Sequence, residues 1–473
     1  MRVSPSTARS IDRQPVTRAG EVTFTDLYEL TMAAGYLAAD HTAPATFDLF
    51  VRRLPEPRNF LVAAGLADVL DHLEQLRITA PELDFLAALD WTDDEYLAML
   101  AELRFTGDVM AMPEGEVVFG NEPIVRVTAP LIEAQIVETK LINLVGSQTM
   151  IASKAARVAL ACGDRRFVEF GARRTHGGDA AMQAARSAWI GGAAGTSLVS
   201  AGLRWGIPLS GTMAHSYVMS FADELDAFRS FARRFPDGAV LLIDTYDTEE
   251  GARRAVQVAH ELADEGVTVG GVRLDSGDLA RLASSVRKIL DEGGLTETSI
   301  FASGDLDEYR ITEILATGAP IDAFGVGTQL GTSADAPSLG AVYKLVADAG
   351  GPKIKLSADK VTLPGLKQVW RVSDGSVDRY DVIALDDEKL STRRGDLPDG
   401  WVARPLLHEV MVGGQRVGPD PDIESIQERC RQAVASLPTR LRSLQQRERP
   451  YEVRWSTGVQ GLVDELTAAH RPV

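Results

Sequence analysis

The sequence is poor in cysteine, in long apolar runs and in positive charge, and each shortage excludes a class of protein. Its 473 residues include only two cysteines, Cys162 and Cys430, so we expect neither a disulfide framework nor a zinc site, and a reducing compartment such as the cytoplasm is the predicted location. No apolar stretch approaches the roughly 18 residues that a membrane-spanning helix needs. The chain has 49 Lys and Arg against 67 Asp and Glu, and its formal net charge of −18 disfavours nucleic acid and anionic membranes as partners.

What is present is an ordinary globular composition, 45% hydrophobic and 25% charged, over a length that predicts two or three domains. Residues 1–20 are polar and lack the apolar core of a secretion signal, so we expect a disordered lead-in. Residues 21–130 mix helical and strand patterns, which predicts an N-terminal α+β domain. Residues 131–345 predict an α/β domain. Residues 346–473, with a long polar helix expected near 423–447, predict a C-terminal segment that packs back on the N-terminal domain.

Short apolar runs, each followed by polar residues and then by a helical stretch, recur through the middle of the chain. Continuous apolar runs indicate strands that are buried on both faces of a parallel sheet. Because nearly every run ends in residues that could bind a ligand, the pattern favours an irregular α/β barrel, in which all strand ends surround one mouth, over a doubly wound sheet. The polar ends read EFGARR (169–174), SGTMAHS (210–216), IDTYDT (243–248), RLDSGD (273–278), FASGD (301–305) and FGVGT (324–328).

Two features of these strand ends are typical of phosphate binding. The adjacent Arg173 and Arg174 suit a dense anion, although a tight turn with solvated arginines explains them equally well. Two consecutive glycine-rich turns can also cradle phosphate with backbone N–H groups. Their candidate residues are Ser303, Gly304, Gly325, Gly327 and Thr328.

Charged side chains follow three of the apolar runs. Asp244 and Asp275 could hold Mg²⁺, sugar hydroxyls or a developing cation. Arg273 lies two residues before Asp275, so both side chains are expected on the same strand face. They form either a structural salt bridge or a pair that reads an anionic group and a hydroxyl together. His215 in SGTMAHS is either a structural histidine or a further member of the site.

The segment 353–371 is basic although the chain as a whole is acidic. Its lysines, Lys353, Lys355, Lys360 and Lys367, either neutralise a polyphosphate or lie on a solvated hairpin. Together with the strand ends, they describe a site for a phosphorylated sugar that carries more than one phosphate group.

An ordered set of motifs between about residues 22 and 372 resembles the nicotinate phosphoribosyltransferase family. The resemblance implies an irregular α/β barrel packed against an α+β domain built from N- and C-terminal segments, and a homodimer with shared active sites. It implies that nicotinate is joined to 5-phosphoribosyl 1-diphosphate (PRPP), with ATP hydrolysis coupled through a phosphohistidine and with Mg²⁺ assisting. The motifs are TDLYELTM, RRLP..RNFL, EFG.RR, SGT.AHS, IDTYDT, VRLDSGDL, GVGT, PSLG.VYKLV and KL....K.TLPG.

The same resemblance implies a role for each matching residue. His215 matches the phosphorylated histidine, and Asp244 and Asp275 match acids near the ribose. Tyr28, from the neighbouring chain, and Phe170 match the two sides of a sandwich around the pyridine ring. The other matches are Arg273 with Thr212 at the pyridine substituent, Arg173 near substrate and diphosphate, and Ser303, Gly304, Gly325, Gly327 and Thr328 at the 5′-phosphate.

One position bears on the choice of base. Enzymes that use nicotinamide carry an aspartate in the segment before AHS, and here Ser197 lies roughly at that place. A carboxylate there would repel nicotinate, so its absence fits the acid. A nicotinamide phosphoribosyltransferase and a non-catalytic nucleotide-binding homologue are the alternatives.

Overall fold

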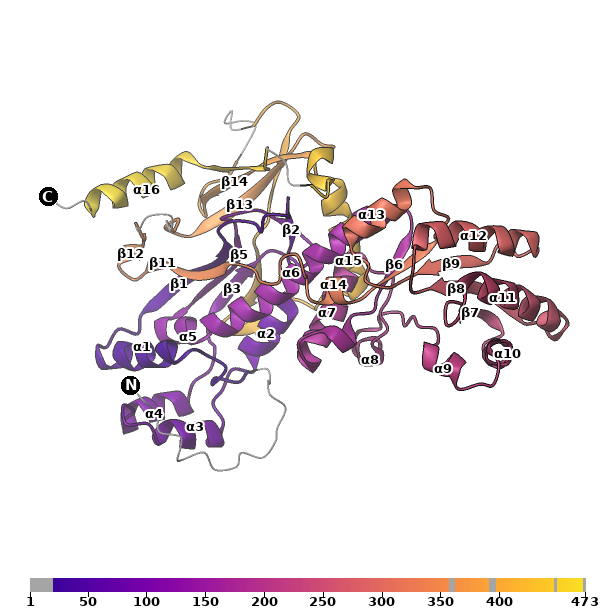
Figure 1. Ribbon diagram of the computed structural model, residues 1–473. Helices are drawn as coiled ribbons and strands as arrows, with labels where there is room; N and C mark the ends of the chain where they lie inside the picture. The colour runs from indigo at the N-terminus through magenta and orange to yellow at the C-terminus, as the bar shows by residue number, and fades with distance from the viewer. Residues whose placement is uncertain (1–19, 357–361, 391–396, 446–448, 471–473) are drawn as a thin grey trace. The chain divides into compact units, whose positions relative to one another are not determined.

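The structure is a computed structural model that describes residues 20–356, 362–390, 397–445 and 449–470 (Figure 1). The chain forms two compact units. Unit 1 consists of Met1–Thr149, Ser338–Leu441 and Arg447–Val473, and unit 2 of Met150–Pro337 and Arg442–Gln446. The expected lead-in, apart from Gly20, lies outside the described residues.

The largest sheet of unit 1 is antiparallel and combines strands from both ends of the chain. β1 (Pro44–Val51) pairs with β5 (Pro123–Pro130) on one side and with β11 (Ala341–Asp348) on the other. β3 (Asp108–Ala111) pairs with β5 and with β16 (His408–Val412). The full order is β12-β11-β1-β5-β3-β16-β17, with β12 at Gly351–Pro352 and β17 at Gln415–Arg416.

A smaller sheet and a set of helices complete unit 1. The smaller sheet has the order β15-β13-β14-β18, and β2 (Leu61–Val62) pairs with β4 (Val117–Val118). The strands of the smaller sheet are β13 (Lys367–Ser373), β14 (Asp378–Leu385), β15 (Val402–Pro405) and β18 (Glu452–Trp455). The helices are α1 (Leu27–Ala38), α2 (Leu66–Glu74), α3 (Ala80–Ala87), α4 (Asp94–Ala101), α5 (Leu131–Ile136), α15 (Ile423–Ala435) and α16 (Thr457–Ala469).

The long helix expected near 423–447 is wrong in length, because α15 ends at Ala435. Pro438 follows three residues later, and a proline has no backbone N–H with which to continue the helical hydrogen bonds. A 3₁₀ turn at Thr439–Arg442 takes its place.

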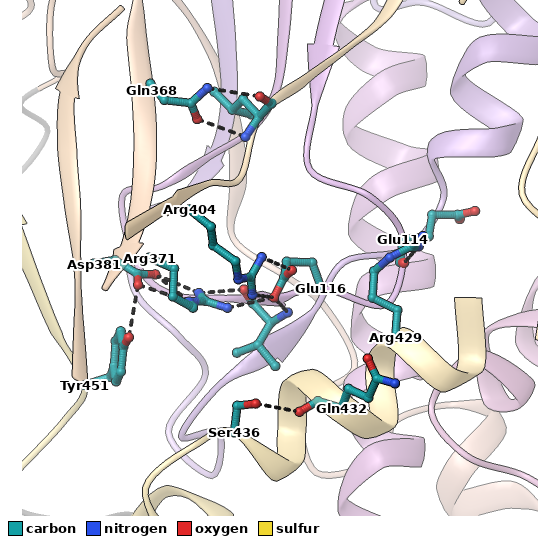
Figure 2. Close-up of polar contacts among 12 residues, drawn as sticks. Glu114, Glu116, Gln368, Arg371, Asp381, Arg404, Arg429, Gln432, Ser436 and Tyr451 are labelled. Atoms are coloured by element: carbon teal, nitrogen blue, oxygen red, sulfur yellow. Dashed lines mark hydrogen bonds and ion pairs between the residues drawn. The ribbon is translucent and has the colours of Figure 1, made fainter. Parts of the chain in front are cut away.

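A buried ionic network connects the smaller sheet to Glu116, which lies in the N-terminal part of the chain (Figure 2). Arg371 on β13 is fully buried and forms ion pairs with Asp381 on β14 at 2.6 Å and with Glu116 at 2.7 Å. The Tyr451 hydroxyl donates to Asp381, and Arg404 on β15 donates to Glu116. Each buried charge therefore has an opposite charge and hydrogen bonds, which is the condition for burying charges without a large loss of stability.

Unit 2 contains a parallel sheet with the order β6-β10-β9-β8-β7, so the predicted parallel sheet is confirmed. Its helices α11, α12 and α13 each connect two successive strands, and α11 packs on β8 (Figure 1). The strands are β6 (Arg166–Glu169), β7 (Asp237–Leu242), β8 (Thr268–Leu274), β9 (Ser299–Ala302) and β10 (Ala323–Val326). The helices are α7 (Gly178–Ile190), α8 (Val199–Trp205), α9 (His215–Met219), α10 (Glu224–Arg234), α11 (Thr248–Leu262), α12 (Leu279–Glu292), α13 (Glu308–Ala316) and α14 (Thr328–Gly331), and α6 (Glu138–Cys162) runs from unit 1 into unit 2.

The strand expected directly before SGTMAHS (210–216) is wrong. Only single parallel bridges continue the sheet beyond β6, from Glu169 to Thr196 and from Thr196 to Leu209. Pro208 cannot donate to a ladder, and Gly206 adopts the left-handed conformation with φ of 73°, so a regular strand does not form. Within the described residues, no pairing joins the segment at Leu209 to β7.

None of the helices in the described parts of the chain is long and apolar enough to cross a membrane.

Candidate active site

The strand ends of unit 2 bring four of the predicted residues into one hydrogen-bonded cluster around Arg273. This residue is next to last in β8, and only 12% of its side chain is exposed. Its guanidinium donates to Asp275 Oδ1 at 2.7 Å, to Ser303 Oγ at 2.8 Å and to Thr212 Oγ1 at 3.2 Å. The salt bridge, one of the two alternatives that the sequence left open, is therefore present. A binding role for the same side chains stays a prediction.

The two predicted aspartates lie side by side at the ends of β7 and β8. Asp244 Oδ2 accepts the backbone N–H of Asp275 at 2.9 Å and the Ser276 hydroxyl at 2.7 Å. Burial raises the pKa of the Asp275 carboxyl, but the hydrogen bond from Ser303 and the charge of Arg273 outweigh this effect, so the pKa lies below its ordinary value. Asp275 is therefore a carboxylate at neutral pH.

Asp244 also has an oxygen that is available to a ligand. Its Oδ1 is buried and has no hydrogen-bond partner. A buried carboxylate oxygen without a donor fits a hydroxyl group or a hard cation. Across the described residues there is no group of three or more His, Cys, Asp or Glu that could hold a metal ion by itself. Mg²⁺ commonly binds through one or two carboxylates together with phosphates of the substrate, so Asp244 fits that mode.

His215 is the first residue of α9 and points toward the same cluster. Its Nδ1 lies 3.1 Å from Thr245 Oγ1, and its Nε2 lies 3.8 Å from Asp275 Oδ2. The side chain is 40% exposed. The Thr245 contact orients the ring, whereas the Nε2 contact with Asp275 is too long for a hydrogen bond.

Phe170 follows β6 and lies beside the Arg273 guanidinium. The Arg273 Cζ atom is 5.6 Å from the centre of the Phe170 ring. The centres of the Phe170 and Phe301 rings are 5.7 Å apart. Gly325 lies inside β10 and not in the turn where the sequence placed it. A Cβ atom there would be 2.7 Å from the Phe170 ring, so this packing gives glycine at 325 a different reason from phosphate binding.

The two glycine-rich turns approach neighbouring backbone closely. Gly304 has φ of +99°, and a Cβ atom at this residue would lie 2.1 Å from the carbonyl oxygen of Asp275. A Cβ atom at Gly327 would lie 3.1 Å from the carbonyl oxygen of Phe170. Thr328 begins α14 directly after Gly327. Glycine is therefore required at 304, and both turns are adjacent to residues of the cluster.

Three family models match the chain in order along its length. They are described as the nicotinate phosphoribosyltransferase N-terminal domain (residues 23–146), the nicotinate phosphoribosyltransferase family (165–358) and the nicotinate phosphoribosyltransferase C-terminal domain (366–462). The chain belongs to the nicotinate phosphoribosyltransferase family. The resemblance drawn from the motifs is thereby confirmed.

Individual members of the family match over most of the chain. A nicotinate phosphoribosyltransferase of Mycobacterium tuberculosis is 45% identical over 447 residues, covering 94% of each chain. One from Bacillus subtilis is 47% identical over 380 residues, covering 78% of this chain and 77% of the other. The crystal structure of human nicotinic acid phosphoribosyltransferase superposes with a TM-score of 0.83 at 30% identity, over 93% of this chain and 99% of the human chain.

Two residues with roles implied by the family lie outside the cluster. Arg173 lies in the 3₁₀ turn Ala172–Arg174 and its side chain is exposed. Tyr28 lies on α1 in unit 1 and is 46% exposed. Burial and the negative charge of Glu138 raise the pKa of its hydroxyl, so it is uncharged at neutral pH. The roles of Arg173 and Tyr28 stay predictions.

The basic segment divides into lysines with different surroundings. Lys367 is buried and its ammonium group donates to the carbonyl oxygens of Leu363 and Gly365 and pairs with Asp48 at 2.9 Å. All three of its protons are thus used within unit 1, which leaves none for a polyphosphate. Lys353 pairs with Asp348 at 2.9 Å and is partly exposed. Lys360 lies outside the described residues.

Sequence reasoning missed the residues that support the cluster. Ser276 and Thr245 each follow a predicted aspartate directly and bond to Asp244 and His215 respectively. The Thr196 hydroxyl donates a hydrogen bond of 2.6 Å to the carboxylate of Glu169, the residue directly before Phe170. Glu169 stands in the EFG motif, so a charged residue at the end of an apolar run was a signal that could have been used.

Proposed function

We propose that the protein joins nicotinate to PRPP, giving nicotinate mononucleotide and diphosphate, as a step in the salvage synthesis of NAD. Membership of the family supports this reaction. The observation that carries it for this chain is the Arg273 guanidinium, which lies beside the Phe170 ring at the end of the parallel sheet. A flat aromatic face next to a planar cation fits a flat ring that carries a carboxylate.

In this proposal, the base lies against Phe170 with its carboxylate toward Arg273 and Thr212. The Tyr28 ring of a neighbouring subunit covers the other face. Arg273 already bonds to Asp275 and Ser303, so it is held in place before nicotinate arrives. A preorganised guanidinium loses little entropy when it forms a charge-assisted hydrogen bond with a carboxylate.

The ribose of PRPP lies near Asp244 and Asp275, and its 5′-phosphate near the turns at Ser303–Gly304 and Gly327–Thr328. The ring nitrogen of nicotinate forms a bond to C1 of the ribose as the bond from C1 to the diphosphate oxygen breaks. Positive charge that develops at C1 is stabilised by the two carboxylates. Arg173 assists the leaving diphosphate, and Mg²⁺, with Asp244 as a ligand, would supply further charge neutralisation. A pyridine nitrogen is nucleophilic without losing a proton, so no side chain has to act as a general base.

His215 is proposed to accept a phosphoryl group from ATP and so to couple ATP hydrolysis to product formation. Its exposed side chain supports the assignment, and the Thr245 contact at Nδ1 would orient the ring.

Three broader expectations belong to the same proposal. The parallel strands curve into an irregular barrel whose mouth holds the site, and no pairing among the described residues joins its two edges, at Leu209 and at β7. The protein works as a homodimer with composite sites. The cytoplasm is the proposed location, since both cysteines are buried free thiols, as a reducing compartment permits.

The direct test is diphosphate release from PRPP with nicotinate and, in parallel, with nicotinamide, each with and without ATP. We expect release with nicotinate and stimulation by ATP. Release with nicotinamide alone would overturn the choice of base. Binding of PRPP without release would indicate a non-catalytic homologue.

A further inference from the structure

Glu169, the last residue of β6, is fully buried and holds two different segments of unit 2. One carboxylate oxygen accepts the backbone N–H of Gly171. The other accepts the Thr196 hydroxyl at 2.6 Å. Both oxygens are occupied by donors of the protein, so the side chain acts on its neighbours and does not bind a ligand itself.

On one side, the carboxylate fixes the turn that carries Phe170. The Phe170 N–H donates to the carbonyl of Val326 at 2.8 Å, and the next N–H, of Gly171, donates to Glu169. A Cβ atom at Gly171 would lie 2.8 Å from the Glu169 carboxylate, so the carboxylate fills the space that a side chain would occupy. These contacts set the direction in which the Phe170 ring leaves the sheet.

On the other side, the carboxylate fixes the segment that contains Ser197. Thr196 Oγ1, which donates to Glu169, accepts the N–H of Leu198 at 3.0 Å. The backbone of the same segment pairs with Glu169, because Ser197 N–H donates to the Glu169 carbonyl at 3.0 Å. By the resemblance, Ser197 lies roughly at the place where nicotinamide enzymes carry an aspartate.

We propose that Glu169 is a positioning residue that holds the Phe170 ring and the Ser197 segment in register, and so sets the width of the pocket for nicotinate. This inference rests on the proposed function. The positioning role requires a side chain as long as glutamate, with a hydrogen-bond acceptor directed at the Gly171 N–H. It does not require the negative charge of the carboxylate. A glutamine can accept from Gly171 through its oxygen and donate to Thr196 Oγ1 through its amide nitrogen.

The requirement for length but not for charge is tested with Glu169→Gln and Glu169→Asp. Steady-state KM values are measured for nicotinate and for PRPP, with folding monitored by thermal unfolding. We expect Glu169→Gln to keep the nicotinate KM within about threefold. Glu169→Asp keeps the charge but is one methylene shorter, and we expect it to raise the nicotinate KM by about tenfold or more, with the PRPP KM nearly unchanged. Thr196→Val, which removes the second contact, should act in the same direction.

Glu308→Gln is the matched control, because Glu308 is also fully buried in unit 2 but pairs with Lys154 and Arg157. It should lower the unfolding temperature without changing the nicotinate KM. The inference is overturned if Glu169→Asp keeps the wild-type nicotinate KM, or if both KM values rise in proportion. If the wild-type protein gives no diphosphate from nicotinate and PRPP, the proposed function fails first, and the two failures are therefore distinguishable.

Discussion

At Arg273, a single guanidinium contacts Asp275, Ser303 and Thr212, and it is proposed to bind the carboxylate of nicotinate as well. Removing one partner of a desolvated ion pair costs about 3–5 kcal/mol. We therefore expect Arg273→Ala to lower kcat/KM for nicotinate by two orders of magnitude or more, with far less change in the dissociation constant of PRPP. Arg273→Lys should rescue poorly, because lysine keeps the charge but lacks the planar fork. Equal losses for both substrates would assign Arg273 to the sugar phosphate instead.

His215 provides a prediction about ATP. His215→Ala removes the proposed phosphate acceptor but leaves Arg273, Asp244 and Asp275 in place. Stimulation by ATP should be lost, while slow formation of product without ATP continues. The measurement is acid-labile phosphate on the protein after incubation with radiolabelled ATP. His260→Ala is a suitable control, since His260 lies on α11 and bonds to the carbonyl of Gly293. Acid-labile phosphate that persists in His215→Ala would show that another residue is the acceptor.

A substitution at Gly325 distinguishes between two roles for this residue. The resemblance implies that it binds the 5′-phosphate, whereas the packing indicates that it makes room for the Phe170 ring. If the glycine makes room for Phe170, Gly325→Ala displaces that ring and raises the nicotinate KM by about tenfold. If it binds the 5′-phosphate, the PRPP KM rises instead. Gly178→Ala is the control, because a Cβ atom there meets nothing within 4 Å. A rise in the PRPP KM alone would contradict the packing role.

The first turn of α1, which carries Tyr28, contains a buried carboxyl group with a pH-dependent effect on stability. Glu29 is fully buried and accepts hydrogen bonds from Thr25 and from Thr139. Burial raises its pKa to about 7, only partly offset by the hydrogen bonds from Thr139 and Thr25. The folded state therefore holds a proton that the unfolded state loses near its ordinary pKa of 4.5. The protonated Glu29 carboxyl therefore contributes its full stability to the folded state below pH 4.5. This contribution is lost as the pH rises through about 7.

Glu29→Gln removes this titration and keeps the contacts, since the Thr25 hydroxyl also donates to the Ile136 carbonyl and can accept from the amide. We expect the variant to be more stable than the wild type at pH 8, by about 1–3 kcal/mol, and to differ little at pH 5. Urea unfolding at the two pH values measures the difference. A variant that is equally stabilised, or destabilised, at both pH values would contradict the assignment.

Among the elements, the sequence predicted those with strong local patterns. β7, β8, β9 and β10 were found because each is a continuous apolar run that ends in polar residues. The segment at 206–216 has the same polar end, but Pro208 and the left-handed Gly206 reduce its pairing to one bridge. The helix α15 is shorter than its polar pattern indicated, because Pro438 ends it.

The supporting contacts of the site could not be predicted in the same way. Glu169 and Thr196 are 27 residues apart in the chain, and Arg273 and Thr212 are 61 apart. No local pattern relates such residues, because only the tertiary fold of unit 2 brings them together. Gly325 shows the same limit, since its motif is glycine-rich, whereas the residue that it packs against is Phe170, which follows β6.

On the scale of the whole molecule, the proposed composite site predicts complementation between subunits. Tyr28 belongs to unit 1, whereas Arg273, Asp275 and Phe170 belong to unit 2. If a site takes Tyr28 from one subunit and Asp275 from the other, a hybrid of Tyr28→Ala and Asp275→Ala has one site with both residues intact. Random exchange gives half hybrids with one such site in two, so about a quarter of wild-type activity should return on mixing.

The control for this experiment is a mixture of Arg273→Ala and Asp275→Ala. These residues bond to each other within one chain at 2.7 Å, so both substitutions damage the same half of every site. A hybrid then has no site in which both residues are intact, and mixing should restore nothing. Subunit exchange is first confirmed by mass spectrometry of differently tagged chains. If activity then returns in the first mixture alone, Tyr28 belongs to the neighbour's site. No recovery in either mixture would mean that each chain completes its own site, because a Tyr28 that served its own subunit could not compensate for a defect in another.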